Sequence, residues 1–208
     1  MSCPDFFDQA PVIRMHDALA AFLGAAEGGI MEYRYADAVR LAGHSCPTVA
    51  AAFLMTRAAL RALHEDSLPE RGGVEVAFGD SLADGVTGVM ANVVGLIAGA
   101  AQEGGFKGLG GHYDRRGLLR FEVPMEGTIR FRRTDNGEAV EVSVHTDVVP
   151  ADPQTFPLLR RCVAGEASAG EHSMFRALWQ DRVRRMLLDF ADNADLITVA
   201  PVRLAGVV

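Results

Sequence analysis

The sequence predicts an α+β fold in which a mixed or mostly antiparallel sheet packs against long helices. Residues 47–64 carry apolar side chains at helical spacing, and residues 168–192 repeat that pattern. Residues 128–133 and 138–144 alternate apolar and polar side chains on either side of Asn136-Gly137, the strongest short signal for a β-hairpin. Helices and strands that occur in blocks, rather than in strict alternation, are typical of the α+β class.

The elements of the first half follow in chain order. Residues 12–23 are predicted to form a helix, 30–35 a short extended segment, and 36–42 a turn or short helix. The long helix over 47–64 leads to a strand over 74–78. A helix of about 84–102 contains an uncharged stretch, and its four glycines indicate burial in the protein rather than in a bilayer. On it, Thr87, Ala91, Gly95 and Gly99 are four residues apart, which predicts close packing against another helix or a subunit partner.

The second half begins with a glycine-rich loop at 104–111 and a strand over 118–123, before the hairpin. Pro150 and Pro153 end the sheet region. Helices are predicted over 154–164 and 168–192, and a last strand over 196–202. We therefore expect an α+β core over residues 1–150 and a C-terminal helical extension, 151–208, packed on it.

Composition narrows the class of protein. The chain has 208 residues and a net charge of −7, which argues against a general nucleic-acid binder because phosphate contacts need basic side chains. Its three cysteines are an odd, widely spaced set, which indicates a reducing compartment rather than a disulfide framework. The N-terminal residues show no secretory signal. We expect a cytoplasmic protein without nucleic-acid or membrane partners.

The His44-Ser45-Cys46-Pro47 tetrapeptide is the feature that most directly suggests chemistry. Residues two apart in an extended segment point to the same side, so His44 and Cys46 are expected to present an imidazole and a thiol to one point. Pro47 suits the first position of the following helix, which makes Cys46 the expected N-cap. That position favours the thiolate, the form that binds metals or attacks electrophiles. The alternative is structural: a buried capping cysteine beside a polar histidine.

Two ligands are too few for zinc, and we expect His16 to be the third. Asp17 follows it and is placed to orient the imidazole or to transfer a proton. If the protein is an enzyme, Tyr33, His112 and Asp114 are further candidates for proton transfer. A surface position without a functional role is the alternative for His16 and for His112.

Other motifs exclude several classes of site. The loop at 104–111 lacks the Gly-Lys-Ser/Thr ending of a P-loop, and it does not join a strand to a helix as a dinucleotide fingerprint would. The sequence contains neither Gly-x-Ser-x-Gly nor His-Glu-x-x-His. The remaining histidines, His64, His145 and His172, have no such context and are expected to be structural or exposed.

The segment AGHSCPTVAAAFLMTRAAL resembles the signature of the FmdE family, that of the E subunit of formylmethanofuran dehydrogenase. The resemblance extends over roughly residues 35–145 and includes the strand at 74–78 and Asp84-Gly85-Val86-Thr87-Gly88. It implies an α+β core that forms an intimate homodimer. It also implies a metal ion, zinc or another transition metal, near His44 and Cys46. The family name reflects an operon association and does not supply an activity.

The sequence departs from the family pattern at several positions. It has Ala42 where members often have a further histidine, Thr48 where a glycine follows Cys-Pro, and Val89 where a cysteine follows Thr-Gly. A cysteine-rich zinc finger is missing, and Cys162 is the only late cysteine. These differences argue against a redox thiol pair and leave the metal site to be completed elsewhere.

Two classes of function remain from the sequence. The first is a metal-dependent enzyme that acts on a small molecule through His44, Cys46 and His16. The second is a non-catalytic metal or cofactor carrier, sensor or accessory subunit. The sequence does not decide between them, and it does not identify a substrate.

Overall fold

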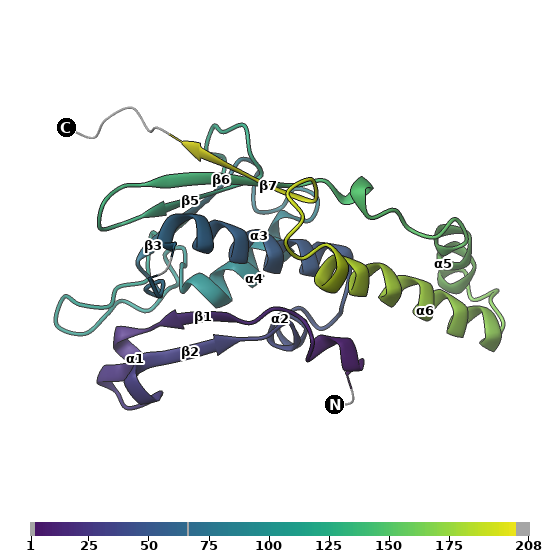
Figure 1. Cartoon of the computed structure of the whole chain (residues 1–208), viewed down its shortest axis with the longest axis horizontal. Coiled ribbons are helices and arrows are strands. Elements are labelled where there is room, and N and C mark those ends of the chain that lie inside the picture. The colour runs from purple at the N-terminus through teal and green to yellow at the C-terminus, as the bar shows by residue number, and fades with distance from the viewer. Residues whose placement is uncertain (1–2, 66, 203–208) are drawn as a thin grey trace.

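The computed structural model describes residues 3–65 and 67–202. Two helices lie between a five-stranded sheet and a two-stranded sheet (Figure 1). The strands are β1 (Ile13–His16), β2 (Ile30–Tyr33), β3 (Val74–Phe78), β4 (Leu119–Arg120), β5 (Ile129–Arg133), β6 (Ala139–Val144) and β7 (Ile197–Val202). The α-helices are α1 (Ala18–Phe22), α2 (Tyr35–Ala42), α3 (Pro47–His64), α4 (Thr87–Ala98), α5 (Thr155–Val163) and α6 (Ala169–Arg184). The predicted α+β class is confirmed.

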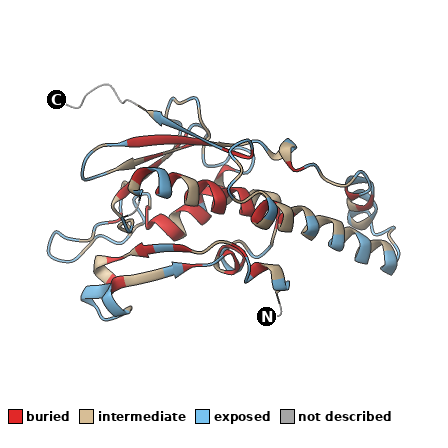
Figure 2. Ribbon diagram, in the orientation of Figure 1, coloured by how far each residue is buried: buried red, intermediate tan, exposed pale blue. Residues whose placement is uncertain are grey.

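The central helix α3 has the bounds that the sequence predicts. Cys46 is its N-cap and Pro47 its first residue. Proline lacks the backbone N–H, and at this position that N–H would have had no partner within the helix. Most of its apolar side chains are buried, Phe53 and Leu54 among them, and α3 lies in the most buried layer of the molecule (Figure 2). The burial of this face, rather than intrinsic propensity, provides most of the stability of such a helix.

The main sheet has the order β4-β3-β5-β6-β7. Only β3 and β4 are parallel, and the other neighbouring pairs are antiparallel. Val76 pairs with Phe131, which pairs with Val140 on the next strand, so a row of buried side chains crosses the sheet. The predicted hairpin turn is present, and Gly137 adopts the positive φ of 78° that favours glycine.

Helix α4 is shorter than the predicted 84–102: it begins at Thr87, and Gly99 ends it in a left-handed conformation. It packs against α2 and α3, and Thr87 and Ala91 of its small-residue row are buried. Helix α4 therefore packs against other helices as predicted, but the glycines of the row do not face them. A Cβ at Gly95 would meet the carbonyl oxygen of Ala100, and one at Gly99 would meet the side chain of Arg71. Within residues 3–65 and 67–202, no helix combines the length and the apolar character that crossing a membrane requires.

Two predicted elements were wrong. Residues 12–23 form strand β1 followed by the short helix α1, not one helix. Asp17 separates them, because its carboxylate caps α1 by accepting hydrogen bonds from the N–H groups of Leu19 and Ala20. The strand predicted over 118–123 is reduced to Leu119–Arg120.

The C-terminal helices extend from one end of the core (Figure 1). The outer part of α6 is largely exposed, whereas Val183, Met186 and Leu187 are buried where the helix meets the core (Figure 2). Directly after α6, residues Arg185–Asp189 form a π-helical turn. The chain then returns as β7 and pairs with β6, so residues beyond 150 complete the main sheet.

Candidate functional site

A cavity of about 550 Å³ lies at the N-terminal end of α3. Its walls come from α3, α4, the end of β6 and the two C-terminal helices. The lining residues are His44, Cys46, Pro47, Thr48, Ala51, Val86, Val89, Met90, Val144, Thr146, Phe156, Trp179 and Arg182. The tetrapeptide that the sequence singles out therefore faces a cavity of the size that small-molecule sites have.

Cys46 is held by its role at the helix terminus. Its backbone is extended, with φ −152° and ψ 168°, and its Sγ accepts the N–H of Val49 at 3.5 Å. The residue is buried, with 8% of its surface exposed, yet it lines the cavity. The predicted N-cap is confirmed, and it places the thiol at the positive end of the helix dipole in a residue that lines the cavity.

His44 is exposed, and its ring is oriented by one backbone contact. Its Nδ1 lies 2.9 Å from the carbonyl oxygen of Ala42. A carbonyl only accepts hydrogen bonds, so Nδ1 carries the proton, and the lone pair of Nε2 is left free. This is the arrangement in which a backbone carbonyl prepares a histidine to bind a metal through Nε2.

Ser45, between these two residues, fixes the segment to the rest of the molecule. Its hydroxyl donates to Gln180 Oε1 at 3.0 Å and accepts from Tyr35 OH at 3.0 Å. Its carbonyl oxygen accepts from Trp179 Nε1 at 3.0 Å and from Gln180 Nε2 at 3.3 Å. Burial raises the pKa of Tyr35, which keeps the phenol protonated as the donor. The sequence gives no signal for these partners, which lie on α2 and α6.

Arg182 is the cation of the cavity, and sequence reasoning missed it. Its Nε donates to the carbonyl of Val149 at 2.7 Å, and its Nη2 donates to that of Thr146 at 2.7 Å. Burial, with a contribution from Arg185, lowers the pKa of Arg182 from its ordinary value. In the part of the chain that the structure describes, no carboxylate pairs with it, whereas Arg184 and Arg185 both pair with Asp181.

The predicted third ligand, His16, lies elsewhere, at the end of β1. Its Nδ1 contacts Glu70 Oε2, and it does not line the cavity of His44 and Cys46. Throughout residues 3–65 and 67–202, no three histidine, cysteine, aspartate or glutamate side chains gather in a group that could hold a metal ion. One chain thus brings together two of the three predicted ligands.

Asp17 belongs to a buried ionic cluster next to His16. Arg71 Nη1 and Arg115 Nη2 each lie 3.0 Å from one of its carboxylate oxygens. Burial alone would raise the pKa of Asp17, but the hydrogen bonds from Ala20 and Arg71 and the charge of Arg115 lower it overall. Tyr33 is also buried here, with the Arg71 guanidinium 5.8 Å from its ring centroid.

The remaining candidates for proton transfer are on the glycine-rich segment. His112 is exposed beside Tyr113. Asp114 is paired with Arg116, whose hydrogen bonds lower its pKa to about 2. Asp17, Tyr33, His112 and Asp114 do not line the cavity, so the structure does not bring them together with Cys46.

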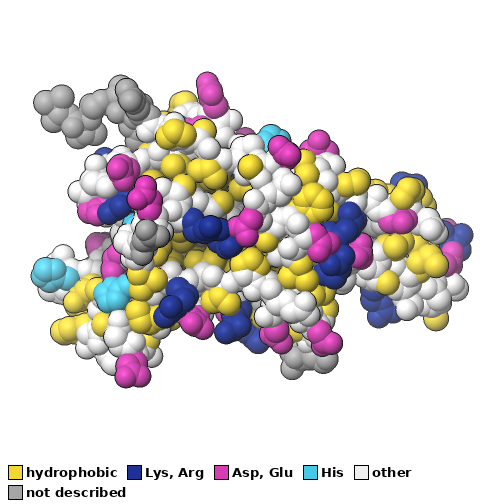
Figure 3. Space-filling view, viewed as in Figure 1, with side chains coloured by type: hydrophobic (Ala, Val, Ile, Leu, Met, Phe, Trp, Pro, Cys, Tyr) yellow, Lys and Arg dark blue, Asp and Glu magenta, His cyan; other side chains and the backbone are white. Residues whose placement is uncertain are grey.

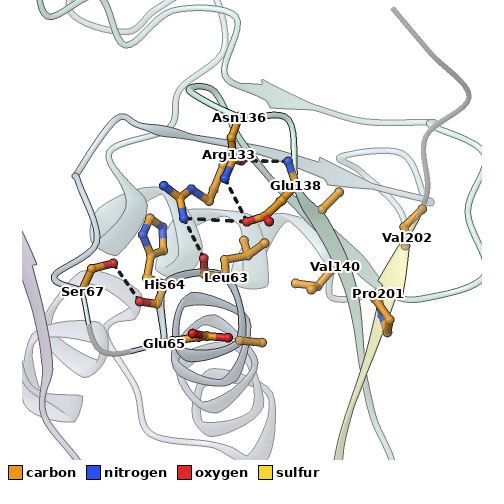
Figure 4. Close-up of a pocket in the computed structure, with 12 residues that line it drawn as sticks. Leu63, His64, Glu65, Ser67, Arg133, Asn136, Glu138, Val140, Pro201 and Val202 are labelled. Atoms are coloured by element: carbon orange, nitrogen blue, oxygen red, sulfur yellow. Dashed lines mark hydrogen bonds and ion pairs between the residues drawn. The ribbon is translucent and has the colours of Figure 1, made fainter.

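A second cavity, of about 700 Å³, lies between the end of α3, the β5–β6 turn and β7 (Figure 4). Arg133 Nη1 donates to the carbonyl of Leu63 at 3.0 Å and lies 3.8 Å from Glu138 Oε2. Burial and the charge of Arg133 lower the pKa of His64 on the same wall. Since its arginine, Arg133, already pairs with Glu138 and Asp135, this cavity is a weaker candidate than the smaller one at α3.

Comparison with known proteins shows which protein family the sequence matches. Residues 41–192 match the family model described as FmdE, molybdenum formylmethanofuran dehydrogenase operon. Among solved structures, the chain is similar to a tungsten formylmethanofuran dehydrogenase FmdE-like protein from Syntrophus aciditrophicus. The two are 16% identical, with a TM-score of 0.46 over 83% of this chain and 74% of that one. No curated protein matches the sequence.

Proposed function

Since this chain belongs to the FmdE family, we propose that the cavity at the start of α3 binds a transition-metal ion together with a small molecule. His44 Nε2 and Cys46 Sγ would hold the ion. The observation that carries the proposal is that a histidine with a free Nε2 and a cysteine thiol line the same cavity. A bound ion would supply Lewis-acid character toward an oxygen atom of the small molecule.

The two side chains are of the right chemical type to bind such an ion, but they are fewer than the ligands it needs. Thiolate and imidazole suit zinc, the metal we expect, as well as nickel, copper and iron. Zinc takes three protein ligands and one open position in catalytic sites, and four protein ligands in structural sites. The positions that this chain leaves open must therefore be filled by groups from outside it. His16 is not part of the proposed set, because it does not line the cavity.

A carrier or sensor role is favoured over catalysis by the composition of the walls. Among the described residues, the lining contains no aspartate, glutamate or lysine. Its only side chains suited to proton transfer near neutral pH are His44 and Cys46, which the proposal uses as ligands. The proton-transfer roles predicted for Asp17, Tyr33 and His112 do not enter this site.

The test is the metal content of untagged protein that has been expressed without metal supplements. We expect about one ion per chain in the parent protein, and its loss in the Cys46→Ser variant. Serine is itself a good N-cap, so this change removes the thiol and leaves α3 capped. Cys162→Ser, on α5 and outside the cavity, is the matched control and should keep the metal. Full occupancy in Cys46→Ser would refute the assignment.

We also propose that the protein is a homodimer. Figure 3 shows apolar side chains at the surface of the projecting α5–α6 end, where Phe156, Val163 and Met174 are exposed. Such exposure is characteristic of surfaces that a partner covers. Light scattering after size exclusion should give the mass of two chains, and the mass of one chain would contradict the proposal.

The proposed location is the cytoplasm. All three cysteines are free thiols in the structure, which a reducing compartment preserves. Fractionation of cells that express the protein without a tag should place it with cytoplasmic markers. Its appearance in an oxidising compartment would contradict the proposal.

A further inference from the structure

We infer that this cavity takes a small organic carboxylate with an apolar body, and that Arg182 pairs with its carboxylate. The inference deepens the proposed function, because it names the class of small molecule that enters the same cavity. It does not depend on the metal, since Arg182 and the apolar walls are present in the protein alone.

The guanidinium of Arg182 is fixed before any ligand arrives. Two backbone carbonyls, at 146 and 149, accept from its Nε and Nη2 at 2.7 Å each. An arginine has five N–H donors, so three have no partner among the residues that the structure describes. A side chain held in this way loses little conformational freedom on binding, and its planar fork matches a carboxylate.

The charge of Arg182 is uncompensated. Of the residues that the structure describes, none that lines the cavity is an aspartate or a glutamate. The nearby Arg185 adds to the positive potential at Arg182. Asp181 pairs with Arg185 and not with Arg182. A half-buried cation without a counter-ion is costly, and a ligand anion removes that cost.

The rest of the lining selects against a small inorganic anion. Val89, Met90, Val144 and Phe156 supply apolar walls, and Trp179 adds an indole ring. Phosphate would leave these walls in contact with water and would meet a single fixed cation. An apolar body attached to the carboxylate buries them, at roughly 25 cal/mol for each Å² removed from water. The volume of about 550 Å³ accommodates a molecule of this kind.

The test compares phenylacetate with phenylacetamide, which share the same apolar body and differ in charge. Trp179 is the only tryptophan of the chain and lines the cavity, so its fluorescence reports binding directly. In EDTA-treated protein, we expect phenylacetate to bind at least about tenfold more tightly than phenylacetamide. Equal affinities, or no saturable change up to millimolar concentrations, would overturn the inference. So would tighter binding of inorganic phosphate than of phenylacetate.

Variants then assign the preference to Arg182. Arg182→Gln should remove the difference between the two probes, and Arg182→Lys should keep a reduced one, since it retains the charge and loses the fork. Arg176→Gln removes the same charge from an exposed position on α6 and should leave the preference unchanged. A preference that survives in Arg182→Gln would overturn the assignment. If that variant fails to fold, a crystal structure of the parent with phenylacetate decides, because its carboxylate must contact Arg182.

The metal site and the carboxylate site can be refuted independently of each other. Loss of the probe preference with normal metal content would refute the carboxylate site and leave the metal site intact. A protein without metal that still prefers phenylacetate would refute the metal site alone.

Discussion

The indole N–H of Trp179 donates to the carbonyl oxygen of Ser45 at 3.0 Å, which joins α6 to the segment that carries His44 and Cys46. Gln180 on the same helix contacts both the hydroxyl and the carbonyl of Ser45. The candidate site is therefore shaped by the C-terminal part of the chain as much as by the tetrapeptide. Its geometry should respond to changes on α6.

Trp179→Phe tests this connection, because it keeps an aromatic ring and removes the donor. We expect a loss of about 1 kcal/mol in the free energy of unfolding. We also expect faster amide hydrogen exchange at residues 44–46, since the segment loses one of its anchors. Exchange mass spectrometry measures the second effect. Unchanged protection at 44–46 would show that the hydrogen bond does not hold the segment.

Ser45→Ala removes the hydroxyl between Tyr35 and Gln180 and leaves two buried or half-buried polar groups without it. We expect a loss of about 2 kcal/mol, since unsatisfied partners cost more than the hydrogen bond itself. Tyr35→Phe removes one end of the chain of hydrogen bonds, and a double-mutant cycle of the two changes should show coupling. Urea unfolding measures all three variants. Additive losses would contradict a shared network.

Asp17→Asn should lower stability at neutral pH by about 3–5 kcal/mol, because it leaves Arg71 and Arg115 without their buried counter-charge. The folded-state pKa of Asp17 lies below its ordinary value of 3.8. Its stabilising effect is therefore present above pH 3.8 and is lost as the pH falls through the folded value. Urea unfolding across the acid range should show a shallower decline for Asp17→Asn than for the parent. Asp181→Asn, on the exposed face of α6, is the control, and parallel curves for parent and Asp17→Asn would contradict the prediction.

Gly137→Ala tests the hairpin turn. The φ of 78° at this position is strained for a residue with a Cβ, although the nearest atom to a Cβ there, Arg132 Nη2, is 3.5 Å away. We expect a loss of about 1 kcal/mol from backbone strain alone. Gly104→Ala, which meets no atom within 4 Å and lies outside the positive-φ region, serves as the control. Thermal unfolding of both variants measures the difference, and equal midpoints would contradict the strain argument.

The sequence predicts elements whose ends carry their own chemical signals. Cys46 and Pro47 mark the start of α3, and Asn136-Gly137 marks the hairpin, so both are predicted correctly. Strand β1 alternates buried and more exposed residues over Ile13–His16, a strand signal that the helical prediction for 12–23 did not use. Asp17 stands in the middle of the apolar pattern and acts as a cap there, which the helical interpretation of 12–23 overlooked.

The candidate site also has a part that the sequence predicts and a part that it does not. His44 and Cys46 are near in sequence, and their spacing brings them to one cavity. Trp179 belongs to the apolar stripe of α6, which the sequence assigns to core packing, and Arg182 looks like any other arginine of a charged helix. Their role comes from the packing of α6 against the start of α3, and local patterns contain no information on that contact.

The main sheet is complete only after β7 pairs with β6, beginning with Ile197 opposite Val144. Between these two residues lie the whole of α5 and α6, so β6 remains the outer strand until nearly all of the described chain has left the ribosome. During that interval, β6 presents its unpaired backbone groups to solvent, which is the condition under which strands associate wrongly. The late return of β7 therefore leaves this edge open to wrong association for most of the synthesis of the chain.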